Sequence, residues 1–256
     1  MIDARAVIDP SARLAADVSV GPFSIIGPDV EIGAGTEIGP HVVIKGPTTI
    51  GRDNRIFQFA SIGDEPQDKK YAGEPTRLEI GDRNTIREYV TINRGTVQDV
   101  GVTRLGSDNW IMAYVHIAHD CQVGDNTIFA NNASLAGHVH VGDWAILGGY
   151  TLVHQFCRIG AHSFCGFATG VQRDVPPYFT VAGYRAEPHG INSEGLKRRG
   201  YPAEEIAAIK RAYKLVYMSE LKLAEAIESI REMERDWPRL ALLADFLAAS
   251  DRGVVR

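Results

Sequence analysis

Apolar residues recur at every sixth position through the first two thirds of the chain. Three runs carry this pattern, Ile2 to Ile62, Ile80 to Ile92 and, after a slip of one residue, Leu105 to Val171. The residue after each of these positions is usually small, most often glycine. Because 45% of the whole chain is hydrophobic, an unbroken series of this length indicates an internal structural repeat.

A period of six residues with one inward aliphatic side chain predicts a parallel β-helix. Each hexad forms a short strand and a turn, and three hexads close one triangular coil. Successive coils stack about 4.8 Å apart, so inward residues form ladders such as Ile117–Leu135–Val153–Val171. We expect the small residue after each aliphatic where the coil bends, because a larger side chain would collide with the next wall.

Two segments interrupt the repeat and predict loops that leave the column. Residues 64–77 and 95–104 lack the hexad pattern, and the first of them contains Pro66, Gly73 and Pro75. Proline and glycine in such a segment are typical of an irregular connection. We therefore expect both segments to project from the side of the β-helix.

The repeat ends after Val171, where Pro176 and Pro177 follow. A linker to about residue 190 precedes apolar spacing of helical type, which predicts helices over residues 202–218, 221–236 and 237–250. We expect two domains, a β-helix over residues 1–190 and a small helical domain over residues 191–256.

Composition narrows the classes of function. The formal net charge is −5, which argues against a nucleic-acid-binding protein. Three cysteines lack disulfide spacing, and Cys165 occupies a core position of the repeat, which favours a reduced intracellular protein. Neither an export signal nor an apolar stretch of membrane-spanning length is evident. We expect a cytoplasmic protein without integral membrane association.

Polar residues gather in one predicted corner of the column. Residues 18 apart stack in a β-helix of this period, which brings three successive coils together at His116, His119, Gly137, His138, His154 and Gln155. The corner spans about 10 Å along the column, room for a sugar and a reacting acyl group. His154 stands where the repeat otherwise prefers glycine or alanine, and a large side chain there indicates a function.

Three kinds of chemistry fit this corner. Asp120 follows His119, and a neighbouring carboxylate raises the basicity of an imidazole and selects its tautomer. Gly137 presents a backbone N–H that suits an oxyanion. The alternative explanation is structural, with Asp120 as a solvated acid at the turn and Gly137 as a glycine that permits the turn. Zinc held between subunits through His116 and His119, or a β-helix without catalysis, are the alternatives. We favour general-base catalysis of acyl transfer.

Several stretches resemble one family closely. These are HIAHDCQVGD from His116, ANNASLAGHVHVGD from Ala130, VHQFCRIGAHSF from Val153, NSEGLKRRG from Asn192, IGDEPQDKKYAGEPT from Ile62 and INRGT from Ile92. The chain is similar over essentially its whole length to the acyl-carrier-protein–UDP-N-acetylglucosamine O-acyltransferases, the first enzymes of lipid A synthesis. The resemblance implies the left-handed form of the β-helix.

The resemblance also implies a reaction and its residues. A (R)-3-hydroxyacyl group would pass from acyl carrier protein to the 3-hydroxyl of the sugar in UDP-N-acetylglucosamine. His119 would be the general base, Asp120 would orient it, and the Gly137 N–H would bind the oxyanion. Residues implied to line the substrate site are Asp68, Lys70, His116, His138, His154, Gln155, Asn192, Glu194 and Arg198.

The resemblance further implies a homotrimer with its active sites between neighbouring subunits. Basic residues of the helical domain would meet the acidic acyl carrier protein. No cofactor is expected beyond the phosphopantetheine that this carrier brings, and no metal.

One position bears on substrate choice. Phe167 stands where the family measures the acyl chain and where some relatives carry glycine. Each methylene that a phenyl ring excludes forfeits about 0.8 kcal/mol of burial, so we expect a chain nearer about ten carbons than fourteen. An N-acyltransferase acting on a UDP-amino sugar is the alternative function that the sequence leaves open.

Overall fold

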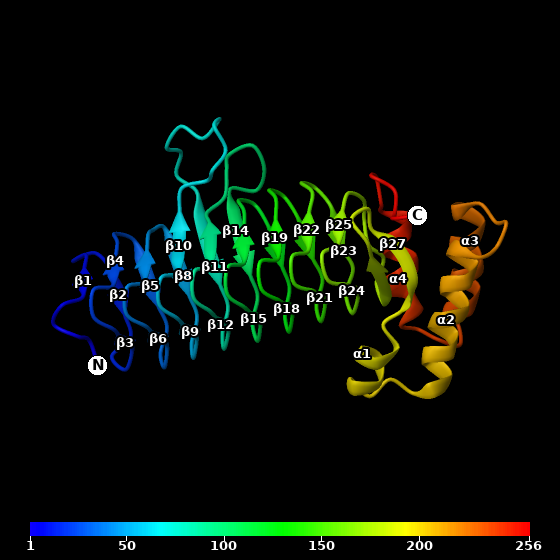
Figure 1. Ribbon diagram of the computed structural model, residues 1–256, viewed down its shortest axis with the longest axis horizontal. Coiled ribbons are helices and arrows are strands. Elements are labelled where there is room, and N and C mark those ends of the chain that lie inside the picture. The colour runs from blue at the N-terminus through cyan, green and yellow to red at the C-terminus, as the bar shows by residue number, and fades with distance from the viewer.

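The computed structural model describes all 256 residues. It is a triangular column of short strands followed by four helices at its C-terminal end, with two loops projecting from one side of the column (Figure 1). Strands three apart in the chain pair in parallel, so the column has three sheets. This is the expected left-handed parallel β-helix with a small helical domain.

Each coil contributes one strand to each sheet, which we call B, C and A in the order in which the chain visits them. Sheet B contains β1 (Val7–Ile8), β4 (Ile25–Ile26), β7 (Val43–Ile44), β10 (Ser61–Asp64), β13 (Thr91–Asn93), β16 (His116–Ile117), β19 (Ser134–Leu135), β22 (Leu152–Val153) and β25 (Gly170–Val171). Sheet C contains β2 (Arg13–Leu14), β5 (Val30–Ile32), β8 (Thr48–Ile50), β11 (Arg77–Ile80), β14 (Val102–Leu105), β17 (Gln122–Val123), β20 (His140–Val141) and β23 (Arg158–Ile159). Sheet A contains β3 (Ser19–Val20), β6 (Glu37–Ile38), β9 (Arg55–Ile56), β12 (Thr85–Ile86), β15 (Trp110–Ile111), β18 (Ile128–Phe129), β21 (Ile146–Leu147), β24 (Phe164–Cys165), β26 (Phe179–Ala182) and the antiparallel β27 (Glu187–Ile191).

The inward aliphatic residues form the core, as their spacing predicts. Ile117 pairs with Leu135, Leu135 with Val153, and Val153 with Val171, and all four side chains are buried. The glycines that follow the aliphatic residues are required for a different reason than the expected collision with the next wall at a bend. A Cβ on Gly33 would lie 2.7 Å from the carbonyl carbon of Gly51 in the next coil, so the collision is with the stacked coil and not with a wall of the same coil.

The corners of the column have a conformation that the hexad pattern does not reveal. Nineteen residues other than glycine have a positive φ, each between 54° and 70°. In the second half of the repeat they fall at every sixth position, three residues after the inward aliphatic, as at Asp120, His138 and Phe156. This left-handed region is unfavourable for L-residues, so burial of the ladders holds the corners in place.

The two expected loops leave neighbouring coils at the same edge of the column, between sheets B and C. The first connects β10 with β11 and the second connects β13 with β14, and Figure 1 shows them side by side above the column. Arg94, at the start of the second loop, donates to the Tyr71 hydroxyl of the first loop at 2.9 Å. It also donates to the Gly63 carbonyl at 3.0 Å. The two loops are therefore joined at their bases.

The C-terminal segment contains α1 (Ser193–Arg198), α2 (Ala203–Tyr217), α3 (Leu223–Glu234) and α4 (Leu240–Ala248). The last three agree with the predicted helices within a few residues, whereas α1 was not predicted. Their apolar faces pack with Tyr178 and Phe179 of the last coil in a second core. The domain boundary predicted at residue 190 falls inside β27. No helix combines the length and apolar character that crossing a bilayer requires.

Candidate active site

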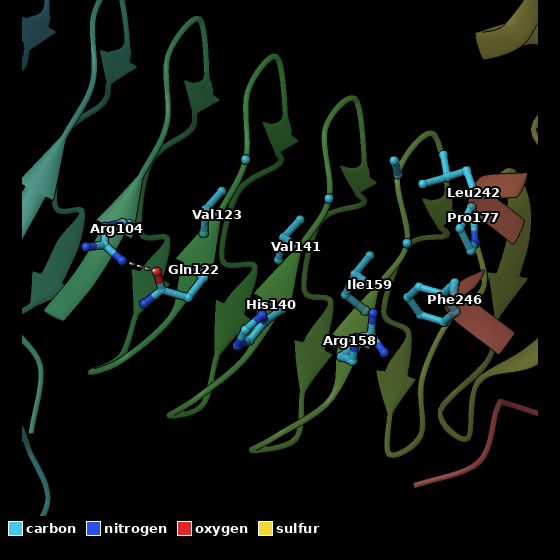
Figure 2. Close-up of a pocket in the computed structure, with 14 residues that line it drawn as sticks. Arg104, Gln122, Val123, His140, Val141, Arg158, Ile159, Pro177, Leu242 and Phe246 are labelled. Atoms are coloured by element: carbon cyan, nitrogen blue, oxygen red, sulfur yellow. Dashed lines mark hydrogen bonds between the residues drawn. The ribbon is translucent and has the colours of Figure 1, made fainter. Parts of the chain in front are cut away.

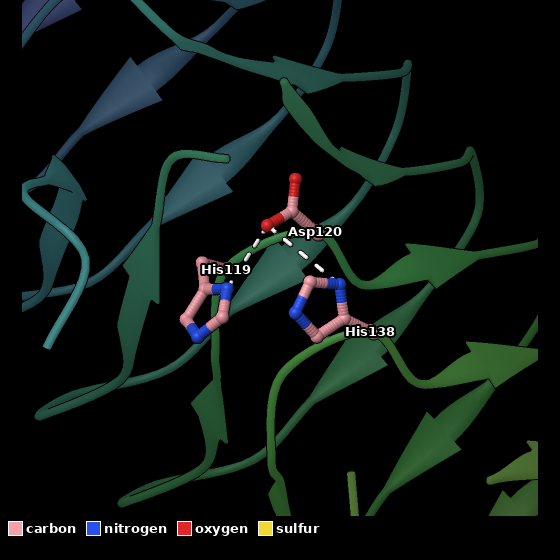
Figure 3. Close-up of side chains that lie close together, drawn as sticks. All are labelled: His119, Asp120 and His138. Atoms are coloured by element: carbon pink, nitrogen blue, oxygen red, sulfur yellow. Dashed lines mark hydrogen bonds and ion pairs between the residues drawn. The ribbon is translucent and has the colours of Figure 1, made fainter. Parts of the chain in front are cut away.

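His119 and Asp120 occupy the corner between sheets B and C, between β16 and β17. The His119 Nδ1 lies 2.9 Å from Oδ2 of Asp120 (Figure 3). Because a carboxylate only accepts, Nδ1 carries a hydrogen and Nε2, on the other side of the ring, is free to take a proton. The pair has the arrangement of a general base and the acid that orients it.

Asp120 is fully buried, and it is not a solvated turn acid. The Thr96 backbone N–H donates to both of its carboxylate oxygens at 3.0 Å, and the Thr96 hydroxyl donates to Oδ2 at 2.6 Å. Burial raises the pKa of Asp120, but the hydrogen bonds from His119 and Thr96 outweigh it and hold the pKa below its usual value. The carboxylate is therefore charged beside the imidazole at neutral pH.

Gly137 lies directly against the His119 ring, one coil further along. A Cβ at Gly137 would be 2.5 Å from Cε1 and 2.7 Å from Nε2 of His119. Only glycine leaves the imidazole its present position, because real Cβ atoms do not approach ring atoms so closely. The Gly137 N–H donates no hydrogen bond within the chain, so it is available to an oxyanion.

His138 completes the cluster from the next corner along the same edge. Its Nδ1 lies 2.7 Å from Oδ2 of Asp99 and 3.9 Å from Oδ2 of Asp120. Its ring stacks on Phe156 with centroids 4.3 Å apart and meets His119 edge-on at 4.9 Å. The imidazole is thus held on its face, on its edge and at one nitrogen.

These residues border a cavity of about 660 Å³. Its walls come from four successive coils and both projecting loops, through Gln67, Asp68, Lys70, Asn93, Gln98, Asp99, Ala118, His119, His138, Gln155 and Phe156. Of the residues predicted from the sequence, the cavity brings together Asp68, Lys70, His119, His138 and Gln155. Its size and polar lining suit a polar ligand.

The other predicted histidines lie outside this cavity. His116 and His154 are on the outer face of sheet B, and the His116 Nδ1 is 2.7 Å from the Thr91 hydroxyl. Burial, and then the nearby His119, lower the pKa of His116. His154 is exposed, with its Nδ1 3.2 Å from the Gln155 carbonyl. Within one chain the cavity therefore brings together two of the four predicted histidines, His119 and His138, and the roles of His116 and His154 stay predictions.

The predicted nucleotide-binding residues also lie elsewhere, at α1. Asn192 caps this helix by accepting from the Gly195 N–H at 3.1 Å and donates to the His162 carbonyl at 3.0 Å. Glu194 pairs with Lys197 at 2.8 Å, which leaves Arg198 without an ion-pair partner in the chain.

Phe167 stands at the edge between sheets A and B. Its side chain is 74% exposed and meets Tyr150 edge-on. It does not border the cavity, so a role in measuring the acyl chain requires a surface from another copy.

Seven cavity or contact residues were missed by the sequence reasoning. Asn93, Ala118 and Phe156 border the cavity from the column. The other four lie in the projecting loops, where no repeat assigns neighbours: Thr96 and Asp99 contact Asp120 and His138, and Gln67 and Gln98 border the cavity. Only the place where the second loop leaves the column, one coil before His119, could have indicated that the loop lies near the site.

A metal ion is the alternative use of the same groups. One ligand atom each from His119, Asp120 and His138 lie within 4.8 Å of one another. This group does not include His116, the partner of His119 in the zinc alternative. Both Nδ1 atoms already contact carboxylates, an arrangement that positions imidazoles for proton transfer as well as for metals.

A second hollow lies on the outer face of sheet C, where it meets α4 (Figure 2). It measures about 410 Å³, and Arg104, His140 and Arg158 line it together with Leu242 and Phe246. Arg158 donates to the Ala249 carbonyl at 3.0 Å and lies over the Phe246 ring. None of the predicted site residues borders this hollow, which makes the cavity at His119 the candidate active site.

Comparisons with known proteins agree with this choice. Residues 174–255 match the family model described as UDP N-acetylglucosamine O-acyltransferase, domain 2. Residues 11–46 and 103–137 match the bacterial transferase hexapeptide model. The acyl-[acyl-carrier-protein]–UDP-N-acetylglucosamine O-acyltransferase of Herminiimonas arsenicoxydans is 64% identical over 260 residues, covering 100% of this chain and 99% of that protein. The protein of the same name from Thiobacillus denitrificans is 63% identical, with the same coverage.

Solved structures give the same result. LpxA from Acinetobacter baumannii superposes with a TM-score of 0.97 at 50% identity, covering 100% of this chain and 99% of that one. The UDP-N-acetylglucosamine acyltransferase of Francisella novicida has a TM-score of 0.98 at 47% identity, covering 100% and 94%. With its hexapeptide column and full-length identity, the chain belongs to the acyl-carrier-protein–UDP-N-acetylglucosamine O-acyltransferase family, a family of enzymes.

Proposed function

We propose that this protein transfers a (R)-3-hydroxyacyl group from acyl carrier protein to the 3-hydroxyl of the sugar in UDP-N-acetylglucosamine, the first step of lipid A synthesis. The observation that carries the proposal is the His119–Asp120 pair, set against Gly137 in a polar cavity. The names of the full-length relatives support the same donor and acceptor.

His119 acts as the general base. Its Nε2 takes the proton of the sugar hydroxyl while the hydroxyl oxygen attacks the thioester carbon. Asp120, charged and fixed by Thr96, stabilises the imidazolium that results. General-base catalysis of this kind contributes roughly 10²–10⁴-fold to the rate.

The tetrahedral intermediate carries a negative oxygen, which the Gly137 N–H stabilises by donating to it. Collapse of the intermediate breaks the carbon–sulfur bond and forms the ester. The leaving thiolate of the phosphopantetheine then takes the proton from the His119 imidazolium. No metal or further cofactor enters this sequence, and the acyl carrier supplies the only prosthetic group.

A trimer would complete the site. Exposed apolar residues mark the outer face of sheet B, where Val7, Ile25 and Leu152 are 62%, 46% and 52% exposed. At the adjoining edge between sheets A and B, Phe23, His41, Phe59, Tyr89 and Tyr114 form an exposed stack with centroids 4.8–5.3 Å apart. An apolar surface of this extent is typical of a contact between subunits.

His116 and His154 lie on this same outer face of sheet B. A neighbouring copy that placed its sheet B against the His119 edge would bring them to the cavity. The same contact between copies would bring four further predicted residues to the substrates: Phe167, Asn192, Glu194 and Arg198. We infer a homotrimer in the cytoplasm, with Arg198 and neighbouring basic residues facing acyl carrier protein.

The experiment is an incubation of purified protein with UDP-N-acetylglucosamine and 3-hydroxyacyl carrier proteins of graded length, followed by product mass spectrometry. We expect one ester product, whose hydrolysis by mild base distinguishes it from the amide that an N-acyltransferase would form on a UDP-amino sugar. Absence of product with every donor would refute the proposed function.

The test of the base is the His119→Ala variant. We expect turnover to fall by at least about 10²-fold, with an unchanged oligomeric state and melting temperature. His189→Ala is a matched control, because His189 is an exposed residue of β27 that does not border the cavity. Full activity of His119→Ala would exclude His119 from the chemistry.

A further inference from the structure

The second projecting loop, residues 94–101, is anchored at both ends. A Cβ on Gly95 would lie 2.3 Å from the Val102 nitrogen and 2.4 Å from the Gly101 carbonyl carbon, so the two ends of the loop touch. The Gly95 N–H donates to the Arg77 carbonyl, and the Arg77 N–H donates to the Gly101 carbonyl. The loop is therefore a tied structure whose inner residues have defined positions.

This loop contacts both histidines of the cavity, by different routes. Thr96 holds Asp120, which contacts His119. Asp99, three residues further on, places its own carboxylate 2.7 Å from the His138 Nδ1. Each imidazole thus has a carboxylate at Nδ1, and the carboxylate that serves His138 comes from the loop and not from the column.

The contact determines which atom His138 presents to the cavity. Because Asp99 only accepts, the hydrogen must be on Nδ1, which leaves Nε2 as the nitrogen that can accept a hydrogen bond from a ligand. Asp120 is 3.9 Å from the same Nδ1, too far for a hydrogen bond. Phe156 stacks parallel to the ring and fixes its plane, but stacking does not distinguish one edge of an imidazole from the other.

We propose that Asp99 is a positioning residue, which orients His138 so that its Nε2 binds the nucleotide-sugar acceptor. The inference rests on the proposed function, because it takes the occupant of the cavity to be that acceptor. Asp99 does not touch the reacting atoms, and His119 remains the base. Removing Asp99 should weaken acceptor binding more than it slows the chemical step.

The kinetic test compares Asp99→Ala and Asp99→Asn with the wild type. We expect Asp99→Ala to raise the KM for UDP-N-acetylglucosamine by about tenfold, the size of one hydrogen bond to a charged group, with kcat changed by less than about threefold. Asp99→Asn retains a carbonyl oxygen that accepts from Nδ1–H, so it should recover most of the lost affinity. Val100→Ala, a change at an exposed residue of the same loop, should leave both constants unchanged.

A double-mutant cycle shows whether Asp99 acts through His138. In the His138→Gln background, Asp99→Ala should cause no further increase in KM, because the ring that it orients is gone. Equal losses in both backgrounds would overturn the proposal. So would an Asp99→Ala variant whose KM stays within about twofold of the wild type, or whose kcat falls as much as its KM rises.

A spectroscopic measurement tests the contact without turnover. In wild-type protein labelled with ¹⁵N-histidine, at mildly alkaline pH, the His138 ring should show its hydrogen on Nδ1. In Asp99→Ala this signal should move toward the Nε2-protonated form, which predominates in free imidazole side chains. An unchanged ring signal would refute the role of Asp99. A wild type unable to acylate UDP-N-acetylglucosamine would refute the proposed function instead.

Discussion

Gly137→Ala is the substitution that most directly tests the geometry at His119. The added methyl carbon would lie 2.5 Å from Cε1 and 2.7 Å from Nε2 of the imidazole. Carbon atoms settle at about 3.5–4.0 Å, so the ring must move by about 1 Å. Nothing in the backbone opposes alanine, because Gly137 has no positive φ.

The displacement affects catalysis more than folding. Moving the ring stretches its 2.9 Å contact with Asp120 and carries Nε2 away from the path of the sugar hydroxyl. A misplacement of about 1 Å in an active site costs about 10²-fold in rate, which corresponds to about 2.7 kcal/mol in the activation barrier. A glycine-to-alanine change at a compatible backbone position adds about 0.4–1 kcal/mol to stability, which offsets the small cost of rearranging one side chain.

The assay measures kcat with UDP-N-acetylglucosamine and a 3-hydroxyacyl carrier protein, together with the melting temperature. We expect Gly137→Ala to lower kcat by about 100-fold, with a melting temperature within a few degrees of the wild type. Gly33→Ala is the matched control. Its Cβ would meet backbone atoms of Gly51, so this variant should lose stability while its folded fraction keeps normal kcat.

Two results would refute this reasoning. A Gly137→Ala enzyme with wild-type kcat would show that the position of the His119 ring does not limit the reaction. A Gly137→Ala protein as unstable as Gly33→Ala would show that Gly137 is required for coil stacking and not for the imidazole.

The remaining predictions concern chain length, pH, metal and salt. Phe167→Gly should shift the preferred donor to longer acyl chains, by about 0.8 kcal/mol for each methylene admitted, and an unchanged optimum in product mass spectra would remove Phe167 from chain selection. Burial, with the charges of Arg199 and Arg239, lowers the pKa of His162 from 6.5 to about 4. The unfolded chain therefore binds this proton more readily than the folded chain. The free energy of unfolding should fall by about 3 kcal/mol as the pH is lowered from 6.5 to 4. Thermal unfolding of His162→Phe should lack that part of the decline, and an identical pH dependence would contradict the assignment. Treatment with EDTA should leave activity within about twofold, whereas loss of activity and its recovery with zinc would favour the metal alternative. Added salt should raise the KM for the acyl carrier protein, because charges on the two surfaces are screened over about 10 Å at 0.1 M, and a salt-independent KM would argue against basic docking.

The arrangement of the column follows from its sequence to an unusual degree. A ladder position needs only an aliphatic side chain at fixed spacing, and Ile117, Leu135 and Val153 pair in the predicted register. The same register places Gly137 against the His119 ring. Periodicity determines neighbours here because each coil repeats the geometry of the last.

The loops could not be predicted in this way. Thr96 contacts Asp120 one coil further along, and Asp99 contacts His138 two coils further along, but no repeat relates a projecting segment to the column beneath it. The histidines on the sheet faces differ in another way. His116 and His154 do not border the cavity of one chain, so their predicted roles depend on a neighbouring copy, whose position the periodicity of one sequence does not give.

The corner position with positive φ, three residues after an inward aliphatic residue, carries side chains with different roles on different edges of the column. At the edge between sheets A and B it carries Phe23, Phe59 and Tyr89, whose rings stack in the open. At the edge between sheets B and C the same backbone position carries Asp120 and His138. New chemistry can therefore arise in this architecture by exchanging single side chains at a corner while the aliphatic interior is left untouched, which makes each edge of the prism a ready scaffold for designed sites.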